Sequence, residues 1–238
     1  MINPDIARFE FGAEISTIEQ FADVYIEAAL AEIERKYGPH GETPLSYHHR
    51  GHTLAVVEAA TTIAKAMLVS AEAPITPHDL QVIRIAAVSH DLVHDGSGDD
   101  EEQSLGILLS VMQREDRFFD DRDRLNAEHM ILATKTTLEN DGLKQSASKD
   151  NVLTQIMADA DLASLGRPPE QYWQSAYSLL LEHNEGMEPT EEQLRRFLEL
   201  QIPILEKHKF YTEEAARLFP HQQENIVFVK AHIAALEH

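Results

Sequence analysis

The stretch TPHDLQVIRIAAVSHDLVH, residues 76–94, decides the fold expected for this chain. Thr76 is a preferred N-cap residue, and Pro77 suits the first position of a helix. Asp79 lies in the first turn, where the helix dipole favours a negative charge. Apolar residues follow at helical spacing. We therefore predict a helix that starts after Thr76, ends near His94 and buries its apolar face.

The same helical spacing of apolar residues continues along nearly the whole chain, and no strand-like alternation longer than a few residues competes with it. We predict an all-α fold, a helical bundle with additional C-terminal helices, as one domain over residues 1–238. Its core would span about 45–166, and about 167–235 would form a C-terminal helical extension. The predicted helical segments are 18–33, 56–68, 100–113, 124–137, 151–166, 170–183, 191–208 and a last one after residue 211.

Three segments are predicted to be loops because turn-forming residues gather in them: 38–44, 96–98 and 140–148. Pro203 falls inside a periodic stretch, where we expect it to kink a helix. The final residues 236–238 resemble the start of an expression tag.

Composition limits the classes of partner and cofactor. The chain has 238 residues, of which 43% are hydrophobic, and it has no cysteine. Any metal must therefore be held by histidine, carboxylate, carbonyl or water, and a reducing cytoplasm is the expected location. The formal net charge of −21 argues against a nucleic-acid polymer or an anionic membrane as partner. No basic leader and no apolar run long enough to span a membrane is expected.

Histidines and aspartates fall on three predicted helices. His90 and Asp91 end an apolar helix, and His52 opens the helix before it. Asp159 and Asp161 lie within a later apolar helix, where unpaired carboxylates would be expensive to bury. A lone histidine in such a place is usually a core residue bonded to the backbone. Together, these side chains suit a divalent ion such as Mn, Fe, Co, Ni or Zn.

The order His52, His90-Asp91, Asp161 resembles that of the HD-domain superfamily of metal-dependent phosphohydrolases, over residues 47–166. The resemblance implies an HD-type helical bundle, in which these four residues are the ligands of one divalent ion, Mg included. The segment ADL, residues 160–162, is similar to the family's Ala-Asp-Leu element. It selects Asp161 over Asp159, which we expect to be structural.

The segment YHHRGH, residues 47–52, is similar to the family's Tyr-His-x-x-x-His element. The resemblance implies that His52 is the ligand and that His48 acts on the substrate or its leaving group. If one helix includes both residues, they share a face with about 6 Å of rise between them.

The segments 99–109 and 129–137 resemble a branch of HD proteins in which Asn-Glu-x-x-Ser follows the His-Asp pair. That branch commonly carries histidine where this chain has Thr136 and Thr137. Binuclear relatives recruit further histidines, and here only His94 and His129 could replace them. We therefore expect one tightly held ion and a second that is weak or absent.

The implied activity is metal-assisted hydrolysis of a phosphate ester of a nucleotide or another small phosphorylated metabolite, by a phosphomonoesterase or a phosphodiesterase. Asp95, His94 or Glu102 would take a proton from water, and His48 would protonate the leaving oxygen.

Arg50 and Lys135 are the cations expected to hold the phosphate, although such side chains are usually solvated. The acidic run 99–102 equally suits the start of a helix. Tyr172, Trp173 and Tyr177 could stack on a base, but core packing is the stronger expectation.

Three alternatives stay open. His90 and His94 are four residues apart, as are the two histidines of the His-Glu-x-x-His element of zinc peptidases. That element would explain neither His52 nor Asp161. A two-iron oxygenase would need two further histidines on the helices between the His-Asp pair and the last aspartate, where only His129 lies. The third is a non-catalytic regulatory or ligand-binding module that keeps the metal. The substrate and the oligomeric state are left open.

Overall fold

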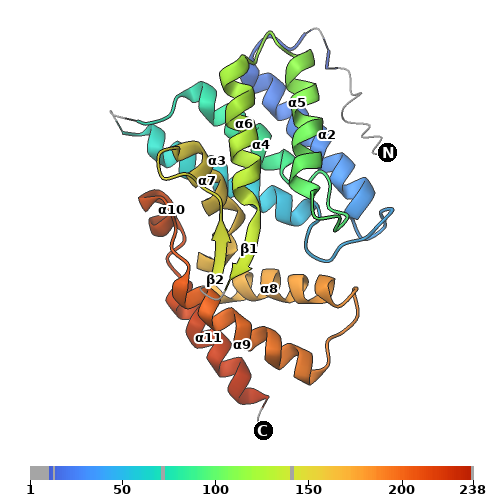
Figure 1. Ribbon diagram of the computed structural model, residues 1–238, viewed down its shortest axis with the longest axis vertical. Helices are drawn as coiled ribbons and strands as arrows, with labels where there is room; N and C mark the ends of the chain where they lie inside the picture. The colour runs from blue at the N-terminus through green and yellow to red at the C-terminus, as the bar shows by residue number, and fades with distance from the viewer. Residues whose placement is uncertain (1–10, 13, 71–72, 140–141, 237–238) are drawn as a thin grey trace.

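Helices make up most of the part of the chain that the computed structural model describes, which is residues 11–12, 14–70, 73–139 and 142–236 (Figure 1). The all-α fold class is confirmed. No described helix is both long and apolar enough to cross a membrane. The predicted tag remnant falls largely on residues 237 and 238, outside the described part. The one-domain organisation stays a prediction.

The elements before the C-terminal extension pack around α4, whose apolar residues are buried on all sides. In chain order they are α2 (Ile18–Tyr37), α3 (Arg50–Leu68), α4 (Pro77–Ser89), α5 (Asp100–Arg114), α6 (Asp121–Thr134) and α7 (Val152–Asp161).

The start of α4 is as predicted, but its end is not. Thr76 caps the helix in a capping box with Asp79, and Pro77 is its first residue. The helix ends at Ser89 rather than near His94. The N–H groups of Val93 and His94 donate to the Ser104 hydroxyl at 3.0 Å and the Tyr37 hydroxyl at 2.8 Å, instead of to carbonyls of a further helical turn.

A β-hairpin replaces the end of one predicted helix and part of one predicted loop. Helix α6 ends at Thr134, and β1 (Thr136–Glu139) pairs antiparallel with β2 (Gly142–Gln145). The pairing sets Gln145 opposite Thr136. Each strand has only four residues, too few for an alternation of apolar and polar residues to stand out in the sequence.

Most of the C-terminal helices form a second apolar cluster below the first in Figure 1, whereas one of them, α10 (Glu213–Leu218), packs on α3 and α7. Tyr172 is buried there, with Trp173 and Tyr177 packed beside it, so core packing explains these aromatic residues. Pro203 lies inside its helix. The remaining elements are η1 (Ala163–Gly166), α8 (Pro169–His183), α9 (Glu191–Lys207), α10 (Glu213–Leu218) and α11 (Gln222–Ala235).

Helix α8 lies between the two groups of helices (Figure 1). Tyr172, Ala176 and Leu180 form its buried face, which belongs to the C-terminal cluster. The opposite stripe of α8 is polar and ends at Glu182, which contacts the segment just before α3. Helix α8 thereby joins the extension to the histidines near the start of α3.

Candidate metal centre

The four predicted ligands lie together, although they come from three parts of the chain. His52 is in the first turn of α3, His90 and Asp91 directly follow α4, and Asp161 ends α7. Asp91 Oδ2 lies 3.0 Å from His90 Nε2 and 3.3 Å from His52 Nε2. Asp161 Oδ1 lies 3.5 Å from His52 Nε2 and 3.7 Å from His90 Nε2.

Three of these atoms are buried and have no hydrogen-bond partner: His52 Nε2, His90 Nε2 and Asp91 Oδ2. An unsatisfied buried polar atom costs about 1–3 kcal/mol, so three that face one another need an explanation. Ligand atoms about 2.0–2.2 Å from one ion lie about 3.0–3.6 Å from each other, close to the separations found here. The donor set therefore fits a divalent cation.

Neighbouring groups orient two of the ligands. His90 Nδ1 lies 2.8 Å from the carbonyl oxygen of Ala87, so Nδ1 donates there and the Nε2 lone pair faces the cluster. Gln145 donates to Asp161 Oδ2 at 3.0 Å, which leaves Oδ1 for the cluster. Gln145 could not be identified from the sequence, because the pairing of the two strands places it beside Asp161.

Burial opposes every charge in the cluster, but the contacts between opposite charges outweigh burial. Burial alone would raise the pKa of Asp91, yet His90 and His52 hold that pKa well below its usual range. Burial alone would lower the pKa of His90, yet Asp91 and Asp161 raise it well above its usual value. The cluster thus stabilises positive charge between its carboxylates, which is what a bound cation requires.

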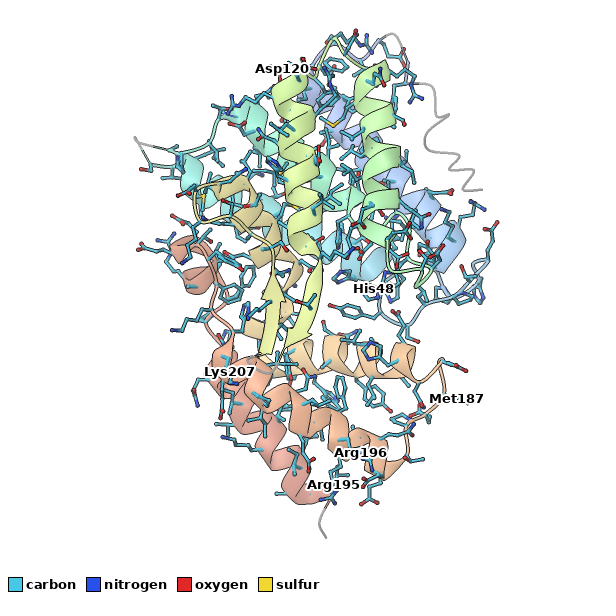
Figure 2. All side chains as sticks on the ribbon, viewed as in Figure 1. His48, Asp120, Met187, Arg195, Arg196 and Lys207 are labelled. Atoms are coloured by element: carbon cyan, nitrogen blue, oxygen red, sulfur yellow. The ribbon has the colours of Figure 1, made fainter. Side chains whose placement is uncertain are left out.

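His48 lies outside α3, in the segment just before it, and above α8 in the view of Figure 2. The helix begins at Arg50, and His49 is its N-cap, with Nδ1 accepting from Gly51 N–H at 2.9 Å. The spacing expected for two residues of one helix therefore does not apply to His48 and His52. His48 still has a ring nitrogen within 4.8 Å of ligand atoms of His52 and Asp91.

Glu182, at the end of α8, holds His48 in place. Its Oε2 accepts from the backbone N–H groups of Tyr47 at 2.7 Å and His48 at 2.9 Å, and its Oε1 contacts His48 Nδ1. Burial disfavours the carboxylate, but these contacts outweigh it and lower the pKa of Glu182 to about 2. Sequence reasoning missed Glu182, because only its place on the polar stripe of an amphipathic helix marks it.

A second group, His48, His94 and Glu182, also has ligand atoms within 4.8 Å of one another. The rings of His48 and His94 are stacked, however, with centroids 3.7 Å apart and planes 20° apart. Nitrogen lone pairs lie in the ring plane, so nearly parallel rings do not direct them at one point. His129 is exposed on α6, outside every such group among the described residues. The arrangement favours one ion.

The structure does not bring Asp95 or Glu102 into these groups of possible ligands. Asp95 is exposed and accepts from Ser97 N–H at 2.9 Å. Glu102 pairs with Lys135 at 3.0 Å, so the proposed base and the proposed phosphate-binding cation are engaged with each other. Glu102 also lies in the first turn of α5, where an acidic charge suits the helix dipole.

Arg50 is the first residue of α3 and is half-buried. It forms no ion pair with a carboxylate in the part of the chain that is described. Its role in binding the phosphate stays a prediction.

Asp159 has the structural role that was expected. It accepts hydrogen bonds from the N–H groups of Tyr211 and Thr212 and from the Thr212 hydroxyl, at 2.7–2.9 Å. Thr212 is the N-cap of α10, so Asp159 anchors the start of that helix. Burial raises the pKa of Asp159 to about 6 despite these bonds.

A comparison with protein families matches residues 50–232 to the HD domain. The match begins with α3 and includes the four candidate ligands as well as Glu182. A comparison with curated proteins gave no match. The chain therefore belongs to the HD domain family, whose members are generally metal-dependent hydrolases.

Proposed function

We propose that the protein is a metal-dependent phosphohydrolase that cleaves a phosphate ester of a nucleotide or another small phosphorylated metabolite. The observation that carries the proposal is the cluster of buried ligand atoms without hydrogen bonds on His52, His90 and Asp91, completed by Asp161. These four residues would hold one divalent ion: Mn, Fe, Co, Ni, Zn or Mg. When bound, the ion would lower the pKa of a coordinated water and offset charge on the phosphoryl oxygens.

His48 would act as the general acid for the leaving oxygen. Glu182 fixes the orientation of its ring and engages Nδ1, so Nε2 is the atom left to exchange a proton with substrate. We expect the general base to lie next to His48, and the candidates are Asp95, His94 and Glu102. Of the three candidates, only His94 contacts His48. Burial and the neighbouring His48 lower the pKa of His94, which favours a neutral ring that can accept a proton.

The alternatives have less support from the geometry. Because α4 ends at Ser89, His90 and His94 do not share a helix face, as the zinc peptidase element would require. A two-iron oxygenase would need two further histidines on the helices between the His-Asp pair and Asp161. His129 lies away from the cluster, so these two ligands are not found on the described helices. The chain has a net charge of −21, which disfavours a nucleic-acid polymer or an anionic membrane as partner. We therefore propose that it acts on a small phosphorylated substrate, in the cytoplasm.

The test is metal analysis of the purified protein, followed by hydrolysis assays with each candidate ion. The substrates are p-nitrophenyl phosphate, bis-p-nitrophenyl phosphate and a nucleotide panel. We expect turnover with at least one ion and none for Asp161→Ala. Metal binding without hydrolysis of any ester would refute the proposal and favour the non-catalytic module.

His48→Asn tests the general acid within the same assay. We expect near-normal metal content and a lower kcat on esters with poor leaving groups, with less effect on p-nitrophenyl esters. Equal losses on both kinds of ester would refute the general-acid role. Loss of metal would make His48 a ligand instead.

A further inference from the structure

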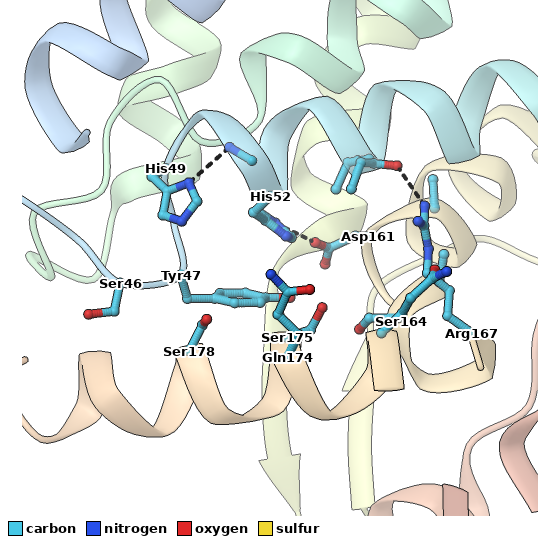
Figure 3. A pocket seen from close by; sticks show the side chains of 16 residues that line it. Ser46, Tyr47, His49, His52, Asp161, Ser164, Arg167, Gln174, Ser175 and Ser178 are labelled. Carbon is cyan, nitrogen blue, oxygen red and sulfur yellow. Dashed lines mark hydrogen bonds and ion pairs between the residues drawn. The ribbon is translucent and has the colours of Figure 1, made fainter. Parts of the chain in front are cut away.

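A cavity of about 340 Å³ lies between the start of α3 and helix α8 (Figure 3). Two of the candidate ligands, His52 and Asp161, line it. The facing wall belongs to α8, with Tyr47 between the two walls. Its volume is at the lower end of the range of small-molecule sites, about 300–1,000 Å³. A molecule whose phosphate lies at the metal centre could therefore extend into this cavity.

The wall formed by α8 is polar but uncharged. Its residues recur at the spacing of one helix face, and Figure 3 shows the three that it labels rising from α8 toward Tyr47 and Asp161. None of these side chains forms a hydrogen bond to another described residue. Amide and hydroxyl groups offer both donors and acceptors, which suits hydroxyl groups of a ligand. The stripe consists of Gln171, Gln174, Ser175 and Ser178.

Arg167 lines the same cavity and is the one basic side chain among its lining residues besides the histidines. Its guanidinium donates to the carbonyl oxygen of Ala55 at 3.4 Å and lies 5.9 Å from the ring of Phe219. No carboxylate among the described residues lies within 4.0 Å of it, whereas Arg35, Arg84 and most other described arginines have such a partner. In so acidic a chain, a half-buried arginine left without a carboxylate can bind an anion.

We infer that this cavity holds the alcohol part of the substrate, and that the substrate is a polyhydroxylated phosphate ester with a second anionic group that Arg167 binds. The inference rests on the proposed function, because it assumes that the phosphate to be cleaved lies at His52 and Asp161. The polar stripe of α8 hydrogen-bonds the hydroxyl groups, and Arg167 selects molecules with two anionic groups over molecules with one. The second group is a phosphate or a carboxylate.

The test compares ligands that differ by one anionic group. The pairs are fructose 1,6-bisphosphate with fructose 6-phosphate, adenosine 3′,5′-bisphosphate with adenosine 5′-monophosphate, and 6-phosphogluconate with glucose 6-phosphate. The third pair replaces the second phosphate by a carboxylate. Binding to metal-loaded protein is followed by thermal shift, and KM is measured wherever an ester is hydrolysed.

For at least one pair, the wild type should bind the member with two anionic groups about 10- to 100-fold more tightly, as expected for a charge-assisted pair. Arg167→Gln should abolish that preference. Arg217→Gln is the matched control: Arg217 is exposed on α10, outside this cavity, with no carboxylate within 4.0 Å among the described residues. It should leave both affinities unchanged.

Ser175→Leu, which fills the cavity from α8, should weaken both members of that pair to a similar extent, with circular dichroism confirming the fold. No preference in the wild type for any pair, or one that persists in Arg167→Gln, would overturn the inference. Unchanged binding in Ser175→Leu would show that the alcohol part lies elsewhere.

These outcomes are distinguishable from a failure of the proposed function. If no ester is hydrolysed with any ion, the proposed function fails, yet the thermal shifts still show whether Arg167 selects molecules with two anionic groups. If esters are hydrolysed without a preference that depends on Arg167, the inference alone fails.

Discussion

Replacement of Glu182 tests whether the C-terminal extension contributes to catalysis. Glu182→Gln preserves the shape of the side chain but removes its charge, so the amide can satisfy only part of the contacts with Tyr47 and His48. Glu182→Ala removes all of them. We expect both variants to bind metal normally, because Glu182 touches none of the four candidate ligands.

The magnitude follows from these contacts. Each hydrogen bond to a charged group contributes about 1.5–3 kcal/mol, and contacts that share one carboxylate are not additive. The Glu182 side chain is only 11% exposed, so solvent screening is modest. We expect Glu182→Ala to lower the free energy of unfolding by about 2–4 kcal/mol and Glu182→Gln by about half as much.

Catalysis should respond according to the leaving group. General acid catalysis contributes about 10²–10⁴-fold, so a misoriented His48 should lower kcat on alkyl phosphates by about 10- to 100-fold in Glu182→Gln. The effect on p-nitrophenyl phosphate should be small, because that leaving group scarcely needs a proton. Urea denaturation supplies the stability and steady-state kinetics supply kcat. Glu192→Gln, at an exposed residue that pairs with Arg196, is the control and should match the wild type.

Two results would refute this reasoning. Equal losses on alkyl and p-nitrophenyl phosphates would mean that Glu182 does not act through proton transfer to the leaving group. Wild-type kinetics and stability in Glu182→Ala would mean that other contacts hold His48.

Four further predictions concern stability and metal content. Chelation should lower the melting temperature, because an ion at a thousandfold excess over its Kd stabilises the native state by about 4 kcal/mol. Asp161→Ala should already melt at the lowered temperature. Additive effects of the chelator and the substitution would contradict the role of Asp161 as a ligand. Asp159→Ala should retain metal but lose about 2–4 kcal/mol of stability in urea denaturation, since three hydrogen bonds at the start of α10 disappear. Loss of metal in this variant would contradict the structural role of Asp159. His208 has a pKa lowered by burial to about 4, against 6.5 unfolded, so protonation of the unfolded chain should remove about 3 kcal/mol of stability as the pH falls from about 6.5 to 4. His208→Gln should weaken that pH dependence, and an identical pH slope would refute the cause. His49→Asn should keep metal and stability, because asparagine is also a good N-cap, whereas His49→Ala should lose about 1 kcal/mol.

Features that depend on neighbours in the chain could be predicted from the sequence. Thr76, Pro77 and Asp79 interact within one helical turn, so the start of α4 was predicted correctly. Helical spacing likewise indicated the all-α class, because a buried stripe repeats with the period of the helix. The resemblance to the HD family selected His52, His90, Asp91 and Asp161, and in the structure each of the two histidines has its Nε2 atom 3.0–3.7 Å from an oxygen of each aspartate.

Contacts between segments far apart in the chain could not be predicted, because only the packing of helices decides them. Glu182 reaches His48 from 134 residues away, and Gln145 reaches Asp161 only because the hairpin pairs as it does. Lys135 lies beside Glu102, which is 33 residues away in the chain, and its role as a phosphate-binding cation stays a prediction. A histidine or a carboxylate can be a candidate ligand, a helix cap or one partner of a surface ion pair, and the groups packed opposite it decide which. The sequence by itself therefore determined the all-α class, the start of α4 and the candidate metal ligands, and the tertiary structure decided which groups surround those ligands.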